Sequence, residues 1–387
     1  MNAATAINND ELLHWLALKL VPGLGTRRAG QLIERYGTPQ AIFRSSPSEL
    51  EASGMSGSVA RSIASGCAFE EAADQHQRML DYGATLVPIT DARYPPRLRE
   101  IFDPPVVLFA RGRIELMSSL MLGIVGTRRP TQYGTAATER LAADLAQAGL
   151  TIVSGIARGI DTAAHKSVLK AGGDTIAVFG CGVDLVYPAE NRKLSQELSE
   201  KGLLLSEFPM CAPAYPQNFP VRNRIISGMC TGVLVVEGAQ YSGSSITAKM
   251  ALEQQREVFA VPGSIMSKMS WGPNLLIKQG AKLVQDWNDV VVDLPAADRR
   301  TLIAKAQARH GILGPETVEQ DGKGSDELSP VSRKLLNALK PDVPVQLDVL
   351  LESFEELSSS ETIAALFELE MTGLARQLPG KNFVRVW

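Results

Sequence analysis

The sequence predicts an α/β protein whose central part is an extended Rossmann-like domain, a doubly wound parallel sheet, flanked by two smaller domains. Six short apolar runs alternate with helical patterns between residues 86 and 295. Runs that are apolar throughout, rather than at every second position, are typical of strands covered by helices on both faces. Helical segments punctuated by glycine precede this region, and a polar stretch rich in Gly, Pro and acidic residues follows it. A length of 387 residues is enough for three such domains.

Residues 1–85 predict a small all-α domain of the helix-hairpin-helix or SAM-like type. The segment VPGLGTRRAGQLI at 21–33 is echoed by SGMSGSVARSI at 53–63, and each pattern is a helix, a glycine turn and a second helix. The start of a helix after such a turn can present backbone amides to a nucleic-acid phosphate. Arg27 and Arg28 favour this contact, but a plain corner between two helices explains the glycines equally well.

The apolar runs of residues 86–295 predict the strands of the central domain. Most of them end at a glycine or reach one within two residues, and small residues there let backbone amides approach a phosphate. Because ligands of doubly wound sheets bind at the carboxyl ends of the strands, we expect the functional site at these turns. The predicted strands lie within Met121–Gly126, Leu150–Gly155, Thr175–Gly180, Leu203–Glu207, Gly232–Glu237 and Glu257–Gly263.

Residues 296–330 are predicted as a linker and residues 331–387 as a winged-helix-like domain. Three helical patterns are followed by a ribbon with Pro379 and Gly380 at its turn, which is the order of a winged helix. The third helix carries Glu361, Glu368 and Glu370 and no Lys or Arg, so DNA phosphates would repel it. We therefore expect this domain to contact protein or to support a dimer. The helical patterns are Val331–Leu339, Gln346–Phe354 and Glu361–Met371.

The charge is nearly balanced along the whole chain. The net charge is −3 and the isoelectric point about 5.9. Residues 1–90 hold 7 Lys and Arg against 9 Asp and Glu, residues 91–295 hold 21 against 19, and residues 296–387 hold 11 against 14. A broad basic surface is therefore excluded, and a nucleic-acid site would have to be a local cluster of cations at the strand ends.

The first predicted strand ends in two arginines. The turn contains Gly126, Thr127, Arg128 and Arg129 and lacks the G-x-G-x-x-G spacing of dinucleotide-binding proteins. Arginine makes bidentate contacts with phosphate, and its position at the carboxyl end of a strand favours this role for Arg128. Solvated loop charges are the alternative.

The second predicted turn combines small residues with charges. Ser154 and Gly155 suit an anion at the start of the next helix, and Arg158 adds a positive charge. Asp161 and His165 are four residues apart on one helix face, as an acid–base pair would need. We expect a structural role instead, in which Asp161 caps or pairs near the helix start and His165 receives its hydrogen bond.

Two further segments bring cations next to an aromatic side chain. Asn191, Arg192 and Lys193 follow a Tyr-Pro turn, and Phe219 precedes two arginines. An aromatic ring beside guanidinium groups can stack an unpaired base while the charges hold phosphates. The alternative is that Phe219 fills the core and that Arg222 pairs with Glu207 or Glu237. The candidate residues of the second segment are Phe219, Arg222, Asn223 and Arg224.

The last candidate turn predicts an anion-binding helix start without the motifs of an enzyme. Ser242, Gly243 and Ser244 follow a strand and open a helix. The order of a Walker A loop is missing, as are a G-x-S-x-G elbow and a cysteine-centred nucleophile motif. The four cysteines and four histidines are scattered, without metal-ligand spacing. These absences disfavour ATP hydrolysis and nucleophilic catalysis, and we expect no metal or cofactor.

The segments between residues 95 and 287 resemble the DNA processing protein A family (DprA, also called Smf). They occur in the family's order: IVGTR at 124–128, VSGIARGIDTAAH at 153–165, YP at 187–188, SE at 206–207, FPVRNRII at 219–226, SGSSITA at 242–248 and VPG at 261–263. The resemblance implies a non-catalytic protein that binds single-stranded DNA, protects incoming DNA, loads the RecA recombinase during natural transformation and dimerises through the Rossmann domain. It assigns phosphate binding to Arg128. A lysine that some members carry after Tyr-Pro is replaced by Ala189, so Asn191, Arg192 or Lys193 would have to supply that contact.

An enzyme is the alternative function. Nucleoside monophosphate phosphoribohydrolases have similar Rossmann domains but need a Pro-Gly-Gly-x-Gly-Thr stretch followed by Glu. This chain has Pro262, Gly263 and Ser264 at the corresponding place, which disfavours hydrolysis. No basic segment followed by an apolar one opens the sequence, and no apolar run reaches the length of a membrane span. We expect a cytoplasmic protein without membrane contact.

Overall fold

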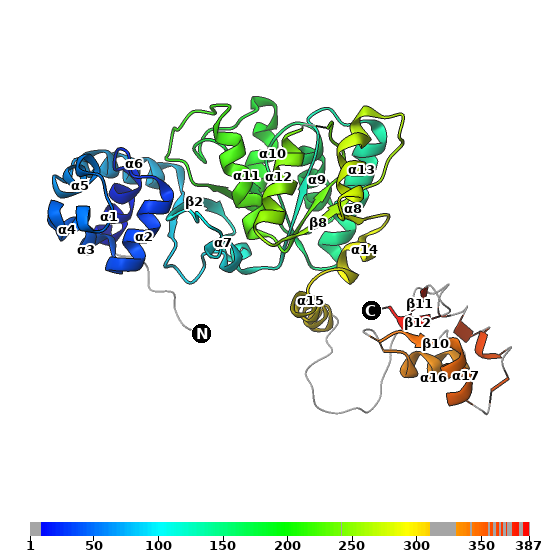
Figure 1. Ribbon diagram of the computed structural model, residues 1–387. Coiled ribbons are helices and arrows are strands. Elements are labelled where there is room, and N and C mark those ends of the chain that lie inside the picture. The colour runs from blue at the N-terminus through cyan, green and yellow to red at the C-terminus, as the bar shows by residue number, and fades with distance from the viewer. Residues whose placement is uncertain are drawn as a thin grey trace. The chain divides into compact units, whose positions relative to one another are not determined.

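The computed structural model (Figure 1) describes residues 9–240, 242–309 and, within 330–386, all but 341–342, 355–356, 359–360, 364, 367–368, 370–373 and 379–381. The chain forms two compact units, Met1–Ala306 and Gln307–Trp387. The first unit contains a nine-stranded sheet in the order β1-β2-β6-β5-β4-β3-β7-β8-β9. Its strands are β1 (Thr85–Pro88), β2 (Val107–Gly112), β3 (Met121–Val125), β4 (Thr151–Ser154), β5 (Thr175–Val178), β6 (Leu203–Ser206), β7 (Gly232–Val235), β8 (Glu257–Ala260) and β9 (Lys282–Leu283).

Seven neighbouring strands, in the spatial order β6-β5-β4-β3-β7-β8-β9, form a parallel sheet with one topological switch point. From β3 the chain moves through β4 and β5 to β6, then returns to place β7 on the other side of β3. All six predicted strands are present, in the predicted doubly wound arrangement. The pair β1 and β2 extends the sheet in antiparallel orientation, with Phe109 of β2 opposite Ser206 of β6. The cleft between the ends of β3 and β7 is where such folds bind their ligands.

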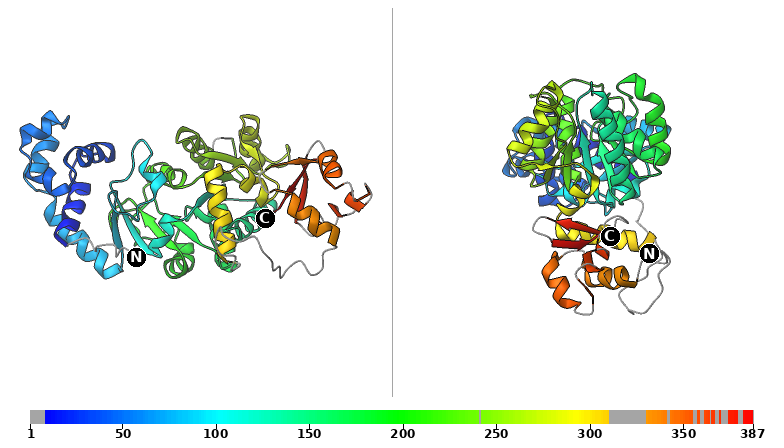
Figure 2. Two further views of the ribbon diagram at one scale, coloured as in Figure 1. Left: turned by 90° about the horizontal axis from the view of Figure 1, so that it is seen from below. Right: turned by 90° about the vertical axis from the view of Figure 1, so that its right-hand side faces the viewer.

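The two faces of the sheet are both covered by helices (Figures 1 and 2). Along β3, Leu122 and Ile124 pack in a cluster with α8 and α9, whereas Met121 and Val125 pack in a cluster with α11 and α12. This alternation explains the apolar runs, since each side chain meets one of the two helical layers. The helices around the sheet are α7 (Pro96–Arg99), α8 (Gln132–Gln147), α9 (Ile160–Lys170), α10 (Arg192–Lys201), α11 (Asn218–Met229), α12 (Gly243–Glu253), α13 (Trp271–Lys278), α14 (Trp287–Val292) and α15 (Ala296–Arg309), with the 3₁₀ helices η1 (Ile114–Ser118), η2 (Ala189–Asn191) and η3 (Lys268–Ser270).

The N-terminal helices form the predicted all-α module, which is joined to the edge of the sheet. The two glycine turns lie where the sequence predicts them, between α1 and α2 and between α4 and α5. The Gln75 amide of α6 donates to the Met210 carbonyl and accepts from the Met210 amide, and the Tyr82 hydroxyl donates to the Val183 carbonyl. One apolar cluster runs from Trp15 to side chains of the sheet. The helices are α1 (Asn9–Leu20), α2 (Thr26–Tyr36), α3 (Pro39–Arg44), α4 (Pro47–Ala52), α5 (Gly57–Ala64) and α6 (Phe69–Tyr82).

The predicted linker is wrong over its first part, because residues 296–309 form α15. Asp298 of this helix is buried and accepts two hydrogen bonds from Arg97, at 2.6 and 2.7 Å. Leu302 packs in the same cluster as α8 and α9. The helix-forming sequence and the buried leucine make residues 296–306 of α15 part of the first unit. The rest of the predicted linker, 310–329, lies outside the described residues.

The second unit contains α16 (Pro330–Ala338), α17 (Leu347–Ser353) and a three-stranded sheet of order β10-β12-β11. Its strands are β10 (Val345–Gln346), β11 (Ala375–Leu378) and β12 (Asn382–Arg385). Two predicted helices and the predicted ribbon are therefore present, and the described residues between 361 and 369 are helical. The predicted turn at Pro379 and Gly380 and the predicted acidic residues Glu368 and Glu370 lie outside the described residues.

Candidate nucleic-acid interface

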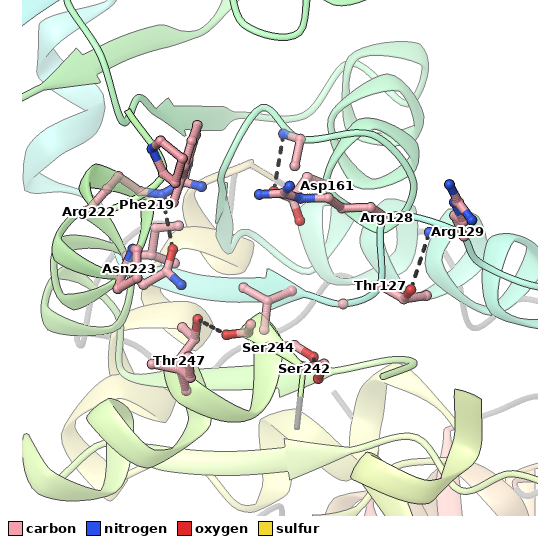
Figure 3. A pocket seen from close by; sticks show the side chains of 18 of the residues that line it. Thr127, Arg128, Arg129, Asp161, Phe219, Arg222, Asn223, Ser242, Ser244 and Thr247 are labelled. Carbon is pink, nitrogen blue, oxygen red and sulfur yellow. Dashed lines mark hydrogen bonds between the residues drawn. The ribbon is translucent and has the colours of Figure 1, made fainter. Parts of the chain in front are cut away.

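A cavity of about 670 Å³ lies at the switch point between the carboxyl ends of β3 and β7 (Figure 3). The loop after β3, from Val125 to Arg129, forms one wall. The first turns of α12 form another, and α11 contributes an aromatic ring and a guanidinium group. Of the predicted site residues, the cavity wall contains Gly126, Thr127, Arg128, Phe219, Arg222, Asn223, Ser242, Gly243 and Ser244.

The ring of Phe219 lies close to two guanidinium groups. The central guanidinium carbon of Arg128 is 5.5 Å from the ring centroid, and that of Arg222 is 5.9 Å from it. Phe219 is half-buried, so it does not simply fill the core. The ring packs on Gly180, where a Cβ atom would lie 2.9 Å from a ring carbon, and Tyr187 lies beside it with 5.7 Å between centroids. An aromatic surface flanked by cations suits an unpaired base together with its phosphates.

Arg222 is a buried cation held in place by its surroundings. Its Nη1 donates to the Val178 carbonyl at the end of β5, and its Nε donates to Asn223 at 3.0 Å. It pairs with neither Glu207 nor Glu237, the two partners considered from the sequence. Burial lowers the pKa of Arg222, and the nearby Asp161 carboxylate opposes this shift. A buried guanidinium with one carboxylate nearby favours an additional anionic ligand.

Position 155 requires glycine, because Arg222 and Asp161 occupy the space that a side chain would need. A Cβ atom there would lie 2.4 Å from Nη1 of Arg222 and 2.5 Å from Oδ2 of Asp161. Asp161 also lines the cavity, and burial raises the pKa of this carboxyl although the Arg222 charge acts against the shift. Gly155 therefore leaves room for Arg222 and Asp161, which line the cavity, but it does not line the cavity itself.

The loop after β3 is fixed to the end of β7 by a buried carboxylate. Glu237 accepts from the Thr131 amide at 2.8 Å and from the Thr131 hydroxyl at 2.6 Å, and the Thr127 amide donates to its main-chain carbonyl at 2.7 Å. Thr131 in turn accepts from the Gly134 amide as the N-cap of α8. These bonds set where the chain leaves β3 and thus where Arg128 emerges.

The start of α12 has fewer unpaired hydroxyl groups than the sequence suggests. The Ser242 hydroxyl accepts from the Ser245 amide at 3.4 Å as the N-cap, and it lies 2.7 Å from the Ser244 hydroxyl. Gly243 is exposed, and a Cβ atom there would meet nothing within 4 Å. The amides of the first helical turn have no acceptor within the helix, so they can bind an anion. The Ser242 hydroxyl is less available, because it already accepts from the Ser245 amide.

Several predicted site residues do not belong to the cavity. Ser154 is fully buried and its hydroxyl donates to the Ile124 carbonyl at 2.6 Å. Asn191 is buried and its amide donates to the Ile156 carbonyl and the Thr162 hydroxyl. Arg192 and Lys193 are exposed at the start of α10, away from the lining. These four residues therefore do not line the cavity, and a contact of theirs with DNA stays a prediction.

The two arginines beyond these turns have acidic partners. Arg158 forms two hydrogen bonds with Glu190, at 2.6 and 2.8 Å, and both side chains are exposed. It lines a small cavity of about 40 Å³ that shares Arg128, Phe219 and Arg222 with the main one. Arg224 is buried and pairs with Glu207 at 2.5 Å and with Asp103 at 3.2 Å. Arg158 is thus at the edge of the site, whereas Arg224 lies outside the main cavity.

His165 is structural, but its partners differ from the expected one. Its Nε2 lies 2.6 Å from the Gly155 carbonyl and its Nδ1 lies 2.7 Å from the Thr175 hydroxyl. Asp161 instead accepts from the Ala157 amide. Burial lowers the pKa of His165 to about 4, so the ring is neutral and Nε2 donates to the carbonyl.

The cavity wall also contains residues to which the sequence assigns no place in the site. Arg129, Asp161 and Tyr187 belong to segments that the sequence singles out, but their contribution to the wall is visible only in the structure. Ile246 and Thr247 lie one helical turn after Gly243 and Ser244, so the periodicity of α12 is the signal that could have identified them.

The structure also gives evidence on metal-ligand groups and on membrane-spanning helices. The described residues contain no group of three or more His, Cys, Asp or Glu side chains placed to hold a metal ion. Within that same part of the chain, no helix is both long and apolar enough to cross a membrane.

Comparisons with known proteins identify two family models along the chain. Residues 85–295 match the model described as DNA recombination-mediator protein A, and residues 319–381 match the DprA winged helix domain. The chain is 46% identical to the DNA processing protein DprA of Bacillus subtilis over 216 residues, which cover 56% of this chain and 73% of the relative. It is 39% identical to the protein Smf of Escherichia coli over 309 residues, which cover 78% and 77%.

Two solved structures resemble the fold. The X-ray structure of DNA processing protein A from Streptococcus pneumoniae superposes with a TM-score of 0.66 at 34% identity, covering 73% of this chain and 98% of that one. A structure of DNA processing protein A from Helicobacter pylori, a protein with a single-stranded DNA binding mode described as unique, superposes with a TM-score of 0.50 at 30% identity, covering 57% and 96%.

Proposed function

The chain belongs to the DNA recombination-mediator protein A family, and from this premise we propose that it binds single-stranded DNA in the switch-point cavity, as a mediator and not as an enzyme. The observation that carries the proposal is the ring of Phe219 with the guanidinium groups of Arg128 and Arg222 both within 6 Å of its centroid. The single-stranded DNA binding of the Helicobacter pylori relative supports the choice of ligand.

The proposed contacts divide between phosphates and bases. Arg128 is exposed at the mouth of the cavity and can reach a phosphate directly, whereas Arg222 supplies a fixed charge from the buried wall. Amides of Gly243 and Ser244 add donors at the start of α12. A base stacks against the Arg128–Phe219 pair. None of these contacts requires a particular base, so binding is expected to depend on the backbone and on stacking rather than on sequence.

The wider role is proposed from the family. It comprises protection of incoming DNA, loading of RecA and a part in natural transformation, by a homodimer formed through the Rossmann domain in the cytoplasm. The winged-helix unit is proposed to contact protein, since Glu361 is an exposed acidic residue on its third helix.

The test is the affinity for oligo-dT, measured by fluorescence anisotropy. Arg128→Glu reverses a charge at an exposed position, so we expect the Kd to rise at least about tenfold while the Tm stays unchanged. Arg61→Glu is the matched control, because it makes the same change at an exposed cation outside the cavity, and its Kd should stay near that of the wild type. Equal affinity of wild type and Arg128→Glu would contradict the proposed site. Release of adenine from AMP would contradict the non-catalytic part.

A further inference from the structure

A second cavity, of about 710 Å³, lies between the N-terminal helical module and the Rossmann domain. Its wall includes the turn from Gly23 to Arg28, between α1 and α2, and the start of α11. Pro220 lines both this cavity and the one at the switch point, so the two share a wall. Val221 and Met250 add apolar surface, and Val221 is exposed. A ligand leaving the first cavity over Pro220 would enter the second.

An exposed aromatic ring with a guanidinium group over it lies in the second cavity. The central guanidinium carbon of Arg27 is 4.1 Å from the ring centroid of Phe102. Phe102 is 74% exposed, so most of its ring is available although it is a large apolar side chain. This pair repeats the combination of Arg128 and Phe219 in the first cavity, with a different arginine from a different domain.

The charge of the second cavity is positive. Its charged lining residues are three arginines and one aspartate: Arg27, Arg28, Arg224 and Asp103. Arg27 and Arg28 are exposed. Arg224 is buried, and its Nη1 has no hydrogen-bond partner although its Nε and Nη2 pair with Asp103 and Glu207. A buried donor without a partner is costly, and an anion beside it would reduce that cost.

The turn at the mouth of this cavity has the geometry of a phosphate-contacting hairpin. Gly23 adopts a positive φ of 78°, which favours glycine, and Gly25 is the N-cap of α2 without a side-chain hydrogen bond. The first amides of α2 are therefore not capped by a side chain. The second glycine turn, before α5, has the same pattern but does not line the cavity.

We propose, on the basis of the function proposed above, that a single strand continues from the switch-point cavity over Pro220 into this second cavity. There the α1–α2 turn and Arg28 hold phosphates, and a base stacks on the Arg27–Phe102 pair. The N-terminal module thereby lengthens the DNA-binding surface of the Rossmann domain. If the DNA occupies both cavities, its affinity should depend on the length of the oligonucleotide.

The test compares oligo-dT of about 6 and about 20 nucleotides, of which the first is short enough to occupy one binding groove and the second is longer than one groove holds. The variants are the double substitution Arg27→Glu with Arg28→Glu, the single substitution Phe102→Ala, and the control Arg61→Glu. Arg61 is exposed on α5, after the second glycine turn, and lines neither cavity. Since all these positions are exposed, the Tm of each variant should match that of the wild type.

We expect the double variant to bind the long oligonucleotide roughly tenfold more weakly and the short one as well as the wild type does. Phe102→Ala should lose about fivefold for the long oligonucleotide alone. Unchanged binding of the long strand, or an equal loss for both strands, would overturn the second cavity as a binding site. If the wild type binds neither oligonucleotide, or if Arg128→Glu leaves the short one bound as before, the function proposed for the first cavity fails instead.

Discussion

The Arg128 guanidinium lies over the ring of Phe219, with 5.5 Å between its central carbon and the ring centroid. One residue follows β3 and the other lies on α11, so the contact joins two segments that are far apart in the sequence. The cation is attracted to the negative face of the ring, which restricts where an otherwise exposed side chain lies. The pair thus places a charge and a stacking surface at one point.

Phe219 and Arg128 should differ in how they affect the salt dependence of binding. We expect Phe219→Leu to weaken oligo-dT binding about tenfold by removing the stacking surface, without changing the slope of log Kd against log salt. Arg128→Ala removes one phosphate contact, so it should reduce that slope by about 0.7. Titrations at several salt concentrations measure both values. A lower slope for Phe219→Leu would mean that the ring acts by holding the arginines and not by stacking.

Gly155 should matter for binding although it is not in the cavity wall. In Gly155→Ala the new methyl group would overlap Nη1 of Arg222 and Oδ2 of Asp161, so the guanidinium must move. We expect the Kd for oligo-dT to rise roughly tenfold, which corresponds to about 1.4 kcal/mol. Gly30→Ala on α2 is the control, since a Cβ atom there meets nothing within 4 Å. Equal affinities for both variants and the wild type would show that Arg222 has room to shift without loss.

The sheet could be predicted from the sequence because its central strands are buried on both faces. Each of the six apolar runs ends one to three residues beyond the end of its strand, so the turns after β3 and β7 could be placed at the same edge. β1 lies at the edge of the sheet, whereas β2 pairs with both β1 and β6 and has a buried apolar run of the same kind, although the six predicted strands do not include it. α15 was missed because its charged sequence is similar to that of a linker, and the burial of Asp298 depends on Arg97, far away in the chain.

The site could be predicted only to the level of segments. Arg222 and Arg224 are both buried on α11, a helix with buried residues on most of its surface, so amphipathic periodicity gives no direction for either arginine. Arg224 is held by two carboxylates from distant segments, Glu207 after β6 and Asp103 after α7, whereas Arg222 donates to the Val178 carbonyl at the end of β5. Ser154 and Asn191 do not line the cavity for a similar reason, because main-chain carbonyls of β3 and of the turn after β4 accept their hydrogen bonds.

Glu190 should reduce DNA affinity by neutralising Arg158 at the edge of the site. Both side chains are exposed, and their two hydrogen bonds lower the pKa of the Glu190 carboxyl. Glu190→Gln keeps the size of the side chain and removes the negative charge, so we expect the affinity for oligo-dT to rise roughly threefold with little change in Tm. The double variant Glu190→Gln with Arg158→Gln is the control and should lose the gain. An affinity that stays the same in Glu190→Gln would place Arg158 outside the path of the DNA.

His165 should make the stability of the protein depend on pH below neutrality. Its pKa is about 4 in the folded protein against 6.5 in the unfolded chain, so between these values the unfolded chain binds more protons. The free energy of unfolding therefore falls as the pH decreases, and from pH 7.5 to about 4.5 this residue should account for about 2 to 3 kcal/mol of the loss. Urea unfolding of the wild type and of His165→Gln at both pH values isolates the contribution, since the effects of Asp161 and other carboxyls are common to both proteins. A pH dependence equal in the two proteins would mean that the folded ring binds its proton as readily as the unfolded one.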